Sequence, residues 1–386
     1  MSSSPVDIII AGGGPVGLYL AGRLIQRGFT CRVLEKRNEP DRHSKSLGIH
    51  PVSLELFDEA GFAEQFLEEG LKIKGGIAFW NREKIGTIRF DDCPPPYRYI
   101  LALPQWKTET ILENRLRSLD EHALIREAEL LDFTNGDDSV TVTFSKDGKQ
   151  HSLTSSILVG CDGKNSFVRN HLNIPFDGSP YPDCYIMGDF SDNTSFETNA
   201  AVYLHRDGLI ESFPLPGKLR RWVVKTETYI EKPGSGQLAA LVEQRIGHSL
   251  SGIKNVMMSS FGVQHFLARS FHSDNVLLAG DAAHVLSPIG GQGMNLGWLD
   301  AEACAETIGR AIKSPEDQPK LFQKYSGERR KIARQVAKRA EINMWLGRRE
   351  TSGPLMKKVV KLMVKKPFSS LFARIFTMRG LGRWWI

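Results

Sequence analysis

The feature that most constrains the fold is an apolar run, Val6 to Ala11, that leads directly into a glycine-rich turn at residues 12–17. Glycine at 12 permits a tight turn, glycine at 14 lets a phosphate approach the backbone, and glycine at 17 lets a helix pack closely. Apolar residues then recur at helical spacing from Leu18 to Ile25, and Thr30 to Glu35 is typical of a second strand. The pattern predicts a β-α-β unit in a parallel sheet, and hence an α/β, Rossmann-like fold.

Glu35 stands at the end of the second predicted strand, eighteen residues after Gly17. A carboxylate here accepts hydrogen bonds from the hydroxyls of an adenosine ribose and repels a phosphate on that ribose. The helix N-terminus offers free N–H groups to a pyrophosphate. We therefore expect an adenine dinucleotide other than NADP, and the alternative is a turn with a structural role only. The expected contacts are Gly12, Gly14, Pro15, Val16, Gly17, Glu35 and Lys36.

Two further segments place an aspartate and small residues directly after a buried strand. The strand Ile157 to Val159 leads into Asp162-Gly163, and the strand Val276 to Ala279 leads into Gly280-Asp281. The second segment continues into a glycine-rich loop, residues 288–295, that runs into a helix. Small residues let a ligand lie close, and a helix N-terminus stabilises negative charge. Both segments therefore add candidate ligand contacts.

These three motifs, in this order and spacing, resemble the group A flavoprotein monooxygenases, the aromatic-hydroxylase type represented by para-hydroxybenzoate hydroxylase. The resemblance covers residues 5–345. It implies FAD as the cofactor, NADH or NADPH as a transient reductant, and O2 as the oxidant, acting through a C4a-hydroperoxyflavin. It also implies an aromatic or polyketide-like substrate that is hydroxylated, with Baeyer–Villiger oxidation and epoxidation left open.

The resemblance implies roles for residues of the first half. The glycine turn would hold the pyrophosphate, and Glu35 the adenosine ribose. Asp162 and Gly163 would contribute to the binding of both FAD and NAD(P)H. Gln105, which precedes a predicted helix from Thr108, would face the flavin chain.

The glycine-rich loop of the second half would hold the flavin itself. Gly280-Asp281 would contact the ribityl-phosphate side, and Pro288 would lie beside the reactive edge of the ring. The residues expected under its pyrimidine side are Gly291, Gly293, Met294 and Asn295.

The resemblance is less clear for the basic residues expected near FAD. Lys45 stands where the resemblance expects an arginine for FAD, and a lysine cannot make the same bidentate contact, so Arg42 is an alternative. Arg220 and Arg221 lie where an arginine near the flavin is expected, and either could instead be a solvated strand charge. No side chain is assigned as a catalytic base; the flavin-proximal candidates are Pro288, Gly291, Arg220 and Arg221.

The secondary-structure pattern predicts that the cofactor-binding segments are interrupted twice. We expect a discontinuous FAD-binding domain at 1–73, 104–174 and 272–345, with a β-rich substrate domain at 74–103 and 175–271. The remaining residues, 346–386, are predicted to form a basic, helical C-terminal tail.

The charge of the chain is concentrated in that tail. Residues 353–386 hold eight Lys or Arg and no acidic residue, whereas the rest holds 42 basic and 44 acidic residues. The body therefore lacks a nucleic-acid-binding character. The tail is amphipathic from Leu355 to Lys366 and carries Trp384 and Trp385, which suggests either peripheral contact with an anionic membrane or an extra helix pair over the flavin and substrate parts. We favour the helix pair.

Five dispersed cysteines without a Cys-x-x-Cys pattern argue against disulfides and a metal site, and they suit the cytoplasm. The N-terminal residues lack a signal-peptide pattern, and no apolar run is long enough to span a membrane. Two other functions remain as alternatives: a reductase of the geranylgeranyl reductase type on the same fold, or a flavin-binding protein without enzymatic activity. A flavin halogenase is disfavoured because its Trp-x-Trp-x-Ile-Pro motif is absent.

Overall fold

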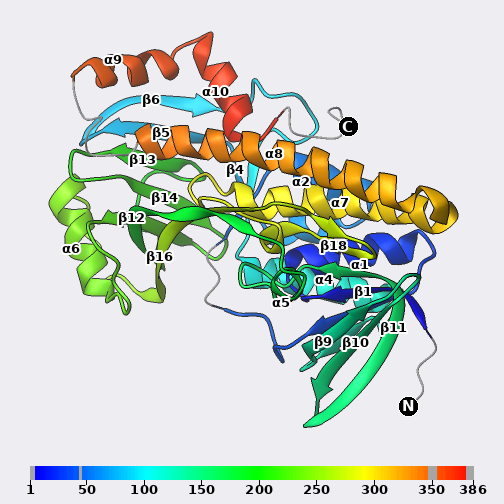
Figure 1. Ribbon diagram of the computed structural model, residues 1–386. Coiled ribbons are helices and arrows are strands. Elements are labelled where there is room, and N and C mark those ends of the chain that lie inside the picture. The colour runs from blue at the N-terminus through cyan, green and yellow to red at the C-terminus, as the bar shows by residue number, and fades with distance from the viewer. Residues whose placement is uncertain (1–4, 43–45, 347–353, 380–386) are drawn as a thin grey trace.

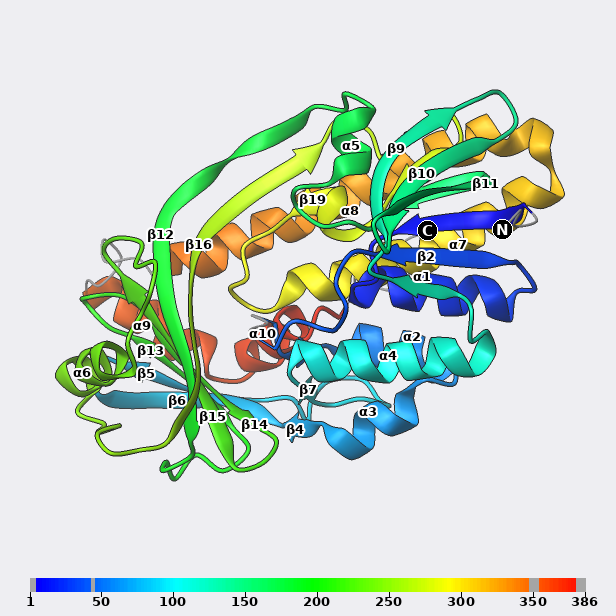
Figure 2. The ribbon, with the colours of Figure 1, turned by 90° about the horizontal axis from the view of Figure 1, so that it is seen from below.

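Two eight-stranded sheets form the framework of the protein and lie at opposite ends of the molecule (Figure 1 and Figure 2). The computed structural model describes residues 5–42, 46–346 and 354–379. Helices α1, α4, α7 and α8 accompany the first sheet, and helices α6, α9 and α10 accompany the second (Figure 1).

The first sheet is parallel along its central strands, which confirms the predicted fold class. In order, the sheet contains β17 (His272–Ser273), β18 (Val276–Leu278), β11 (Lys149–Gly160), β1 (Val6–Ala11), β2 (Cys31–Glu35) and β8 (Leu124–Arg126). The strands from β18 to β8 run parallel to one another, and β1 is fully buried at Ile8, Ile9 and Ile10. Two antiparallel strands extend β11 on one side, β10 (Val140–Lys146) and β9 (Glu129–Asn135).

The second sheet joins strands from both predicted β-rich segments. In order, it contains β19 (His284–Val285), β16 (Asn255–Ala268), β12 (Phe176–Ser191), β15 (Leu219–Thr226), β14 (Ile210–Leu215), β13 (Ala200–Leu204), β5 (Gly75–Trp80) and β6 (Glu83–Arg89). β5 pairs in parallel with β13, and this pairing links the two segments. The long strands β12 and β16 arch from this sheet toward β19 (Figure 2). The domain boundaries themselves stay a prediction.

A small sheet and ten helices complete the described residues. The small sheet contains β3 (Gly48–Ile49), β7 (Ile100–Ala102) and β4 (Leu71–Ile73). The helices are α1 (Pro15–Gln26), α2 (Pro51–Glu59), α3 (Ala63–Glu69), α4 (Gln105–Leu119), α5 (Phe167–His171), α6 (Ser235–Ile246), α7 (Gln292–Lys313), α8 (Gln318–Leu346), α9 (Pro354–Met363) and α10 (Phe368–Phe376). Two short 3₁₀ turns are η1 (Gly280–Ala282) and η2 (Pro315–Asp317). None of the described helices is long and apolar enough to cross a membrane.

The C-terminal helices α9 and α10 lie against β6, as the helix-pair interpretation expects (Figure 1). The side chain of Val364 fills the space beside Gly86, where a Cβ atom would come within 2.5 Å of it. Lys357 and Lys361 both pair with Glu83, at 2.5 and 3.1 Å. Apolar packing and ion pairs therefore hold the helices to the second sheet. Trp384 and Trp385 lie outside the described residues.

Candidate active site

The glycine-rich turn closes tightly on one side and opens on the other. Gly12 has a φ of +104°, and a Cβ there would lie 2.4 Å from the Cys161 carbonyl oxygen. A Cβ on Gly17 would lie 2.0 Å from the Gly12 carbonyl oxygen, so Gly17 lets α1 pack against the turn. A Cβ on Gly14, in contrast, would meet no atom within 4 Å. The turn therefore leaves open space at the N-terminus of α1, where a pyrophosphate fits.

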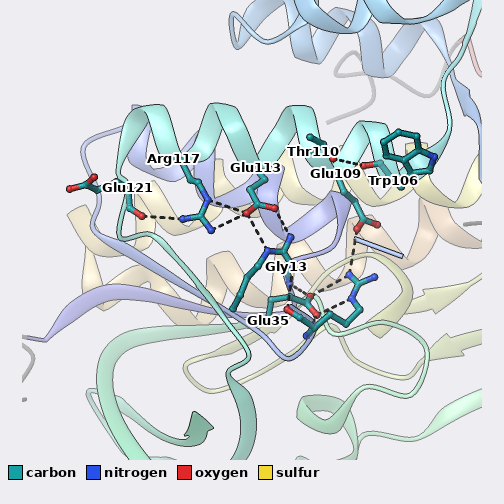
Figure 3. A network of polar contacts seen from close by, with 10 residues as sticks. Gly13, Glu35, Trp106, Glu109, Thr110, Glu113, Arg117 and Glu121 are labelled. Atoms are coloured by element: carbon teal, nitrogen blue, oxygen red, sulfur yellow. Dashed lines mark hydrogen bonds and ion pairs between the residues drawn. The ribbon is translucent and has the colours of Figure 1, made fainter. Parts of the chain in front are cut away.

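Glu35 is held in place at the end of β2. Its carboxylate accepts hydrogen bonds from the backbone N–H of Gly13 at 2.8 Å and from the backbone N–H and Nε of Arg37 at 2.9 and 3.0 Å. Burial alone would raise the pKa of Glu35, but the hydrogen bonds from Arg37 and Gly13 outweigh it and lower the pKa. Figure 3 shows Glu35 and Gly13 beside α4, close to Glu109 and Glu113. An ionised acceptor thus lies beside the turn, as an adenosine ribose requires.

Asp162 and Asp281 follow the other two strands, and both line the same cavity as the glycine turn. Asp162 accepts a hydrogen bond from the backbone N–H of Val168 through one oxygen. Its other oxygen is buried and has no partner in the part of the chain that the structure describes. Burial raises the pKa of both carboxyls. An unsatisfied buried acceptor is costly, so this oxygen is suited to a ligand donor such as a hydroxyl.

A buried ionic cluster fixes the backbone beside Asp281. Asp300 in α7 lies 2.6 Å from Nε of Arg329 in α8 and 2.5 Å from Nε2 of His284. The same carboxylate accepts a hydrogen bond from the backbone N–H of Gly280 at 3.2 Å. His284 therefore has a structural role here.

The loop 288–291 reaches α7 through two consecutive glycines in the left-handed region, with φ of +86° at Gly290 and +65° at Gly291. Asn295, in the first turn of α7, holds the loop. Its Nδ2 donates to the carbonyl oxygens of Gly48 and Gly291, and its Oδ1 accepts from the backbone N–H of His50. The Nε2 atom of His50 lies 3.1 Å from the Gly290 carbonyl oxygen, and burial lowers the pKa of this histidine to about 4. The imidazole is therefore neutral at physiological pH.

One continuous cavity of about 880 Å³ connects these segments with the second sheet. The predicted site residues that line it are Gly12, Gly14, Pro15, Val16, Glu35, Lys36, Gln105, Asp162, Gly163, Arg221, Asp281, Pro288, Gly291, Gly293 and Met294. Gly17, Gly280 and Asn295 do not line the cavity but hold its walls in the contacts described above. Lys45 lies outside the described residues, and its alternative, Arg42, lies over the ring of Trp106, 5.8 Å from the centroid.

The two adjacent arginines of β15 point to opposite faces of the sheet, so Arg220 is not a flavin-proximal residue. Arg220 is fully buried on the far face, where its guanidinium binds Asp192 at 2.9 Å and the carbonyl oxygens of Glu197 and Asn199. Arg221 lines the cavity and forms a bidentate ion pair with Asp189, at 2.7 and 2.9 Å. Successive residues of a strand alternate between faces, which explains the difference.

Sequence reasoning missed three groups of cavity residues. Glu211 lines the cavity from β14, and the buried His50 lines it from the residue that precedes α2. The third group comes from the segment that holds α9 and α10 and consists of Val360, Met363, Val364 and Phe376. A signal for Glu211 was present, since it is the one charged residue in the segment Ile210 to Leu215, whereas the helix contacts depend on tertiary packing.

The chain matches the model of a family described as "FAD binding domain" over residues 5–340. It belongs to this FAD-binding family. The geometry agrees, since the open space at Gly14, the ionised Glu35 and the small-residue segments after β11 and β18 all line one cavity. FAD is therefore the cofactor of this protein.

Relatives of this FAD-binding family member are monooxygenases. It is 34% identical over 342 residues to the rifampicin monooxygenase of Streptomyces venezuelae, covering 86% of this chain and 69% of the relative. It is 31% identical over 353 residues to the 12-dehydrotetracycline 5-monooxygenase/anhydrotetracycline 6-monooxygenase of Streptomyces rimosus, covering 85% and 67%. The protein is an FAD-dependent monooxygenase, and the relatives do not support the reductase or the non-enzymatic alternative.

Solved structures agree with the fold. The p-nitrophenol 4-monooxygenase PnpA of Pseudomonas putida DLL-E4 superimposes with a TM-score of 0.88 at 21% identity, covering 98% of this chain and 99% of that chain. The OxyS anhydrotetracycline hydroxylase of Streptomyces rimosus superimposes with a TM-score of 0.81 at 28% identity, covering 97% and 76%.

Proposed function

We propose that this FAD-dependent monooxygenase uses NADH or NADPH and O2 to hydroxylate an aromatic or polyketide-like small molecule. The observation that carries the proposal is the continuity of the cavity. It runs from Glu35 and the glycine turn, past Pro288, to an apolar wall of the second sheet that includes Met187, Val223 and Phe261. The compounds named for the two relatives, rifampicin for one and 12-dehydrotetracycline and anhydrotetracycline for the other, support a substrate of this class.

Different residues along the cavity would bind different parts of FAD and of the substrate. The turn at Gly14 and the carboxylate of Glu35 would hold the adenosine diphosphate half of FAD. The 288–295 loop and the N-terminus of α7 would hold its flavin, which activates O2 when it is bound and reduced. The apolar wall and the C-terminal helices would bind the ring of the substrate and exclude water.

The experiment is NAD(P)H oxidation under air with a panel of phenols, quinolones and tetracycline-like compounds. We expect oxidation and O2 consumption to rise when a suitable aromatic compound is present. NAD(P)H oxidation that no aromatic compound stimulates, or that is indifferent to O2, would contradict the proposal.

We also propose a cytoplasmic setting, which the five free cysteines support.

We further propose that the outer face of α9 and α10 contacts an anionic membrane surface. Val359, Leu362, Phe368 and Leu371 are exposed on these two helices. Lys358, Lys365 and Arg374 are exposed beside them, and within the described residues no acidic side chain pairs with any of the three. Basic side chains around apolar ones are suited to an interface with anionic lipids.

Co-sedimentation with vesicles tests this surface. We expect the protein to bind vesicles rich in phosphatidylserine more strongly than vesicles of phosphatidylcholine. Lys358→Glu combined with Lys365→Glu should reduce that binding, whereas Lys149→Glu, an exposed change in β11, should not. Negligible binding of the native protein to both kinds of vesicle would contradict the proposal.

A further inference from the structure

Glu211 is a carboxyl group placed on the substrate wall of the cavity. It lies in β14, where it is paired with Val202 of β13 and Val223 of β15, and all three residues line the cavity. Its neighbours in the strand, Ile210 and Ser212, face the opposite side, where Ser212 accepts a hydrogen bond from Arg220. Strand alternation therefore fixes the direction of the Glu211 side chain.

Within the part of the chain that the structure describes, no group forms a hydrogen bond or ion pair with this carboxyl. Yet Glu211 is only 8% exposed. The charged groups on the same face of the sheet already have acidic partners, because Arg221 binds Asp189 and Lys225 binds Asp183. Among the described residues, α9 contributes Val360 and Met363 to the cavity and the residue after it, Val364, also lines it, so this segment offers no polar partner. A buried carboxyl without a partner costs stability, so its presence points to a ligand.

The position of Glu211 relative to the 288–295 loop indicates where that ligand would lie. Ile289, which follows Pro288, packs into the same apolar cluster as Val223, with Val202 and Phe213 beside it. The wall around Glu211 is thus in contact with the loop that would lie at the reactive edge of the flavin. A substrate ring between this wall and the flavin would reach Glu211 with one of its substituents.

We propose that Glu211 binds a phenolic hydroxyl group of the substrate and accepts its proton, which makes phenols the preferred substrates. This inference rests on the proposed function. The O–H bond of the phenol breaks, the carboxylate oxygen takes the proton, and the electron pair stays on the phenol oxygen. No oxidant or reductant is needed for this step, and the ring becomes more electron-rich before oxygen transfer.

The protonation behaviour of Glu211 is suited to this role. Burial raises the pKa of the carboxyl from 4.5 to about 7. A carboxylate with a pKa near neutrality is a stronger base toward a phenol than an ordinary glutamate is, and it is partly ionised at physiological pH. His50, which also lines the cavity beside the loop, has its pKa lowered to about 4 by burial and is bonded to Gly290.

The test measures binding to the FAD-loaded, oxidised protein without any reductant, so that turnover plays no part. The ligands are 2-naphthol and its methyl ether, which has the same rings but no acidic proton. We expect 2-naphthol to bind roughly tenfold to a hundredfold more tightly than the ether at pH 8, with a smaller preference at pH 6. Binding should also produce the absorption of the naphtholate.

The variant Glu211→Gln keeps the size of the side chain but cannot accept the proton. It should retain FAD and bind the ether as the native protein does, yet lose the pH-dependent preference and the naphtholate absorption. Glu211→Asp should restore part of both. Glu231→Gln, an exposed change after β15, is the matched control and should behave as native.

Three outcomes would overturn the proposal, and they are distinguishable. If Glu211→Gln keeps the pH-dependent preference, another group accepts the proton. If Glu211→Gln no longer folds or retains FAD, the carboxyl is structural. If the native protein binds neither 2-naphthol nor the ether, the aromatic substrate class itself fails, and the role of Glu211 fails with it.

Discussion

Replacing Gly14 with valine is expected to abolish FAD binding while the protein stays folded. The backbone of Gly14, with φ of −78° and ψ of −176°, is extended and accessible to valine. A Cβ there would meet no protein atom within 4 Å, so the added side chain would occupy only the space of the pyrophosphate. We expect FAD affinity to fall by about a hundredfold or more, which corresponds to roughly 2.7 kcal/mol. The measurement is titration of the apoprotein with FAD.

The matched control is Gly262→Val in β16, which adds the same side chain where a Cβ again meets no atom within 4 Å. This variant should bind FAD as the native protein does. Gly12→Val should behave differently from both, because it combines a φ of +104° with a Cβ 2.4 Å from a carbonyl oxygen and therefore disturbs the fold. Native FAD affinity in Gly14→Val would show that the pyrophosphate lies elsewhere.

Replacing Asp300 with alanine is expected to cause the largest loss of stability. Asp300 is fully buried, and its carboxylate contacts Arg329, His284 and the backbone N–H of Gly280. Its removal leaves a buried guanidinium without its acidic partner, which costs about 3–5 kcal/mol. Urea unfolding of the FAD-loaded protein measures the change in the free energy of unfolding.

The control is Asp317→Ala in η2, an exposed position where we expect the free energy of unfolding to change by less than about 0.5 kcal/mol.

The dependence of this stability on pH gives a second measurement of the role of Asp300. Burial alone would raise the pKa of Asp300, but Arg329 and His284 outweigh it and lower the pKa. The stabilisation is therefore complete above the unfolded pKa of about 3.9 and is lost as the pH falls through the lower folded value. Asp300→Ala should lose less stability on acidification than the native protein, and equal losses would contradict this role.

The local motifs were predictable because their chemistry depends on neighbours in the sequence. The strand Val6–Ala11, the glycine turn and Glu35 form one β-α-β unit, and the spacing between them is set by the lengths of helix and strand. The segments after β11 and β18 follow the same logic. These elements line the part of the cavity that we propose for FAD, which is why most of the predicted contacts are found there.

The substrate side was not predictable because it depends on which face of a strand each residue takes. Arg220 and Arg221 are adjacent, and only the register of β15 against its neighbours shows that Arg221 lies on the cavity side. Pro180 and Pro182 likewise argue against a strand at these positions, because proline cannot donate a hydrogen bond to a sheet. In the structure, β12 begins at Phe176, and a register shift between Pro180 and Cys184 accommodates the prolines.

The same limit applies to the long-range contacts. The segment 175–271 was predicted as β-rich, and the helix α6 within it was missed. The contributions of α9 and α10 to the cavity bring together residues separated by most of the chain. No local pattern contains that information, since it arises only when the tail packs against β6.

The transfer of oxygen from O2 to an aromatic product tests the assigned chemistry most directly. The FAD-loaded protein would be supplied with NADH or NADPH, with oxygen-18 gas, and with an aromatic compound that stimulates NAD(P)H oxidation. Mass spectrometry should find one labelled oxygen atom in each hydroxylated product. Product that forms equally well without O2, or that carries oxygen from water alone, would contradict the assignment as a monooxygenase.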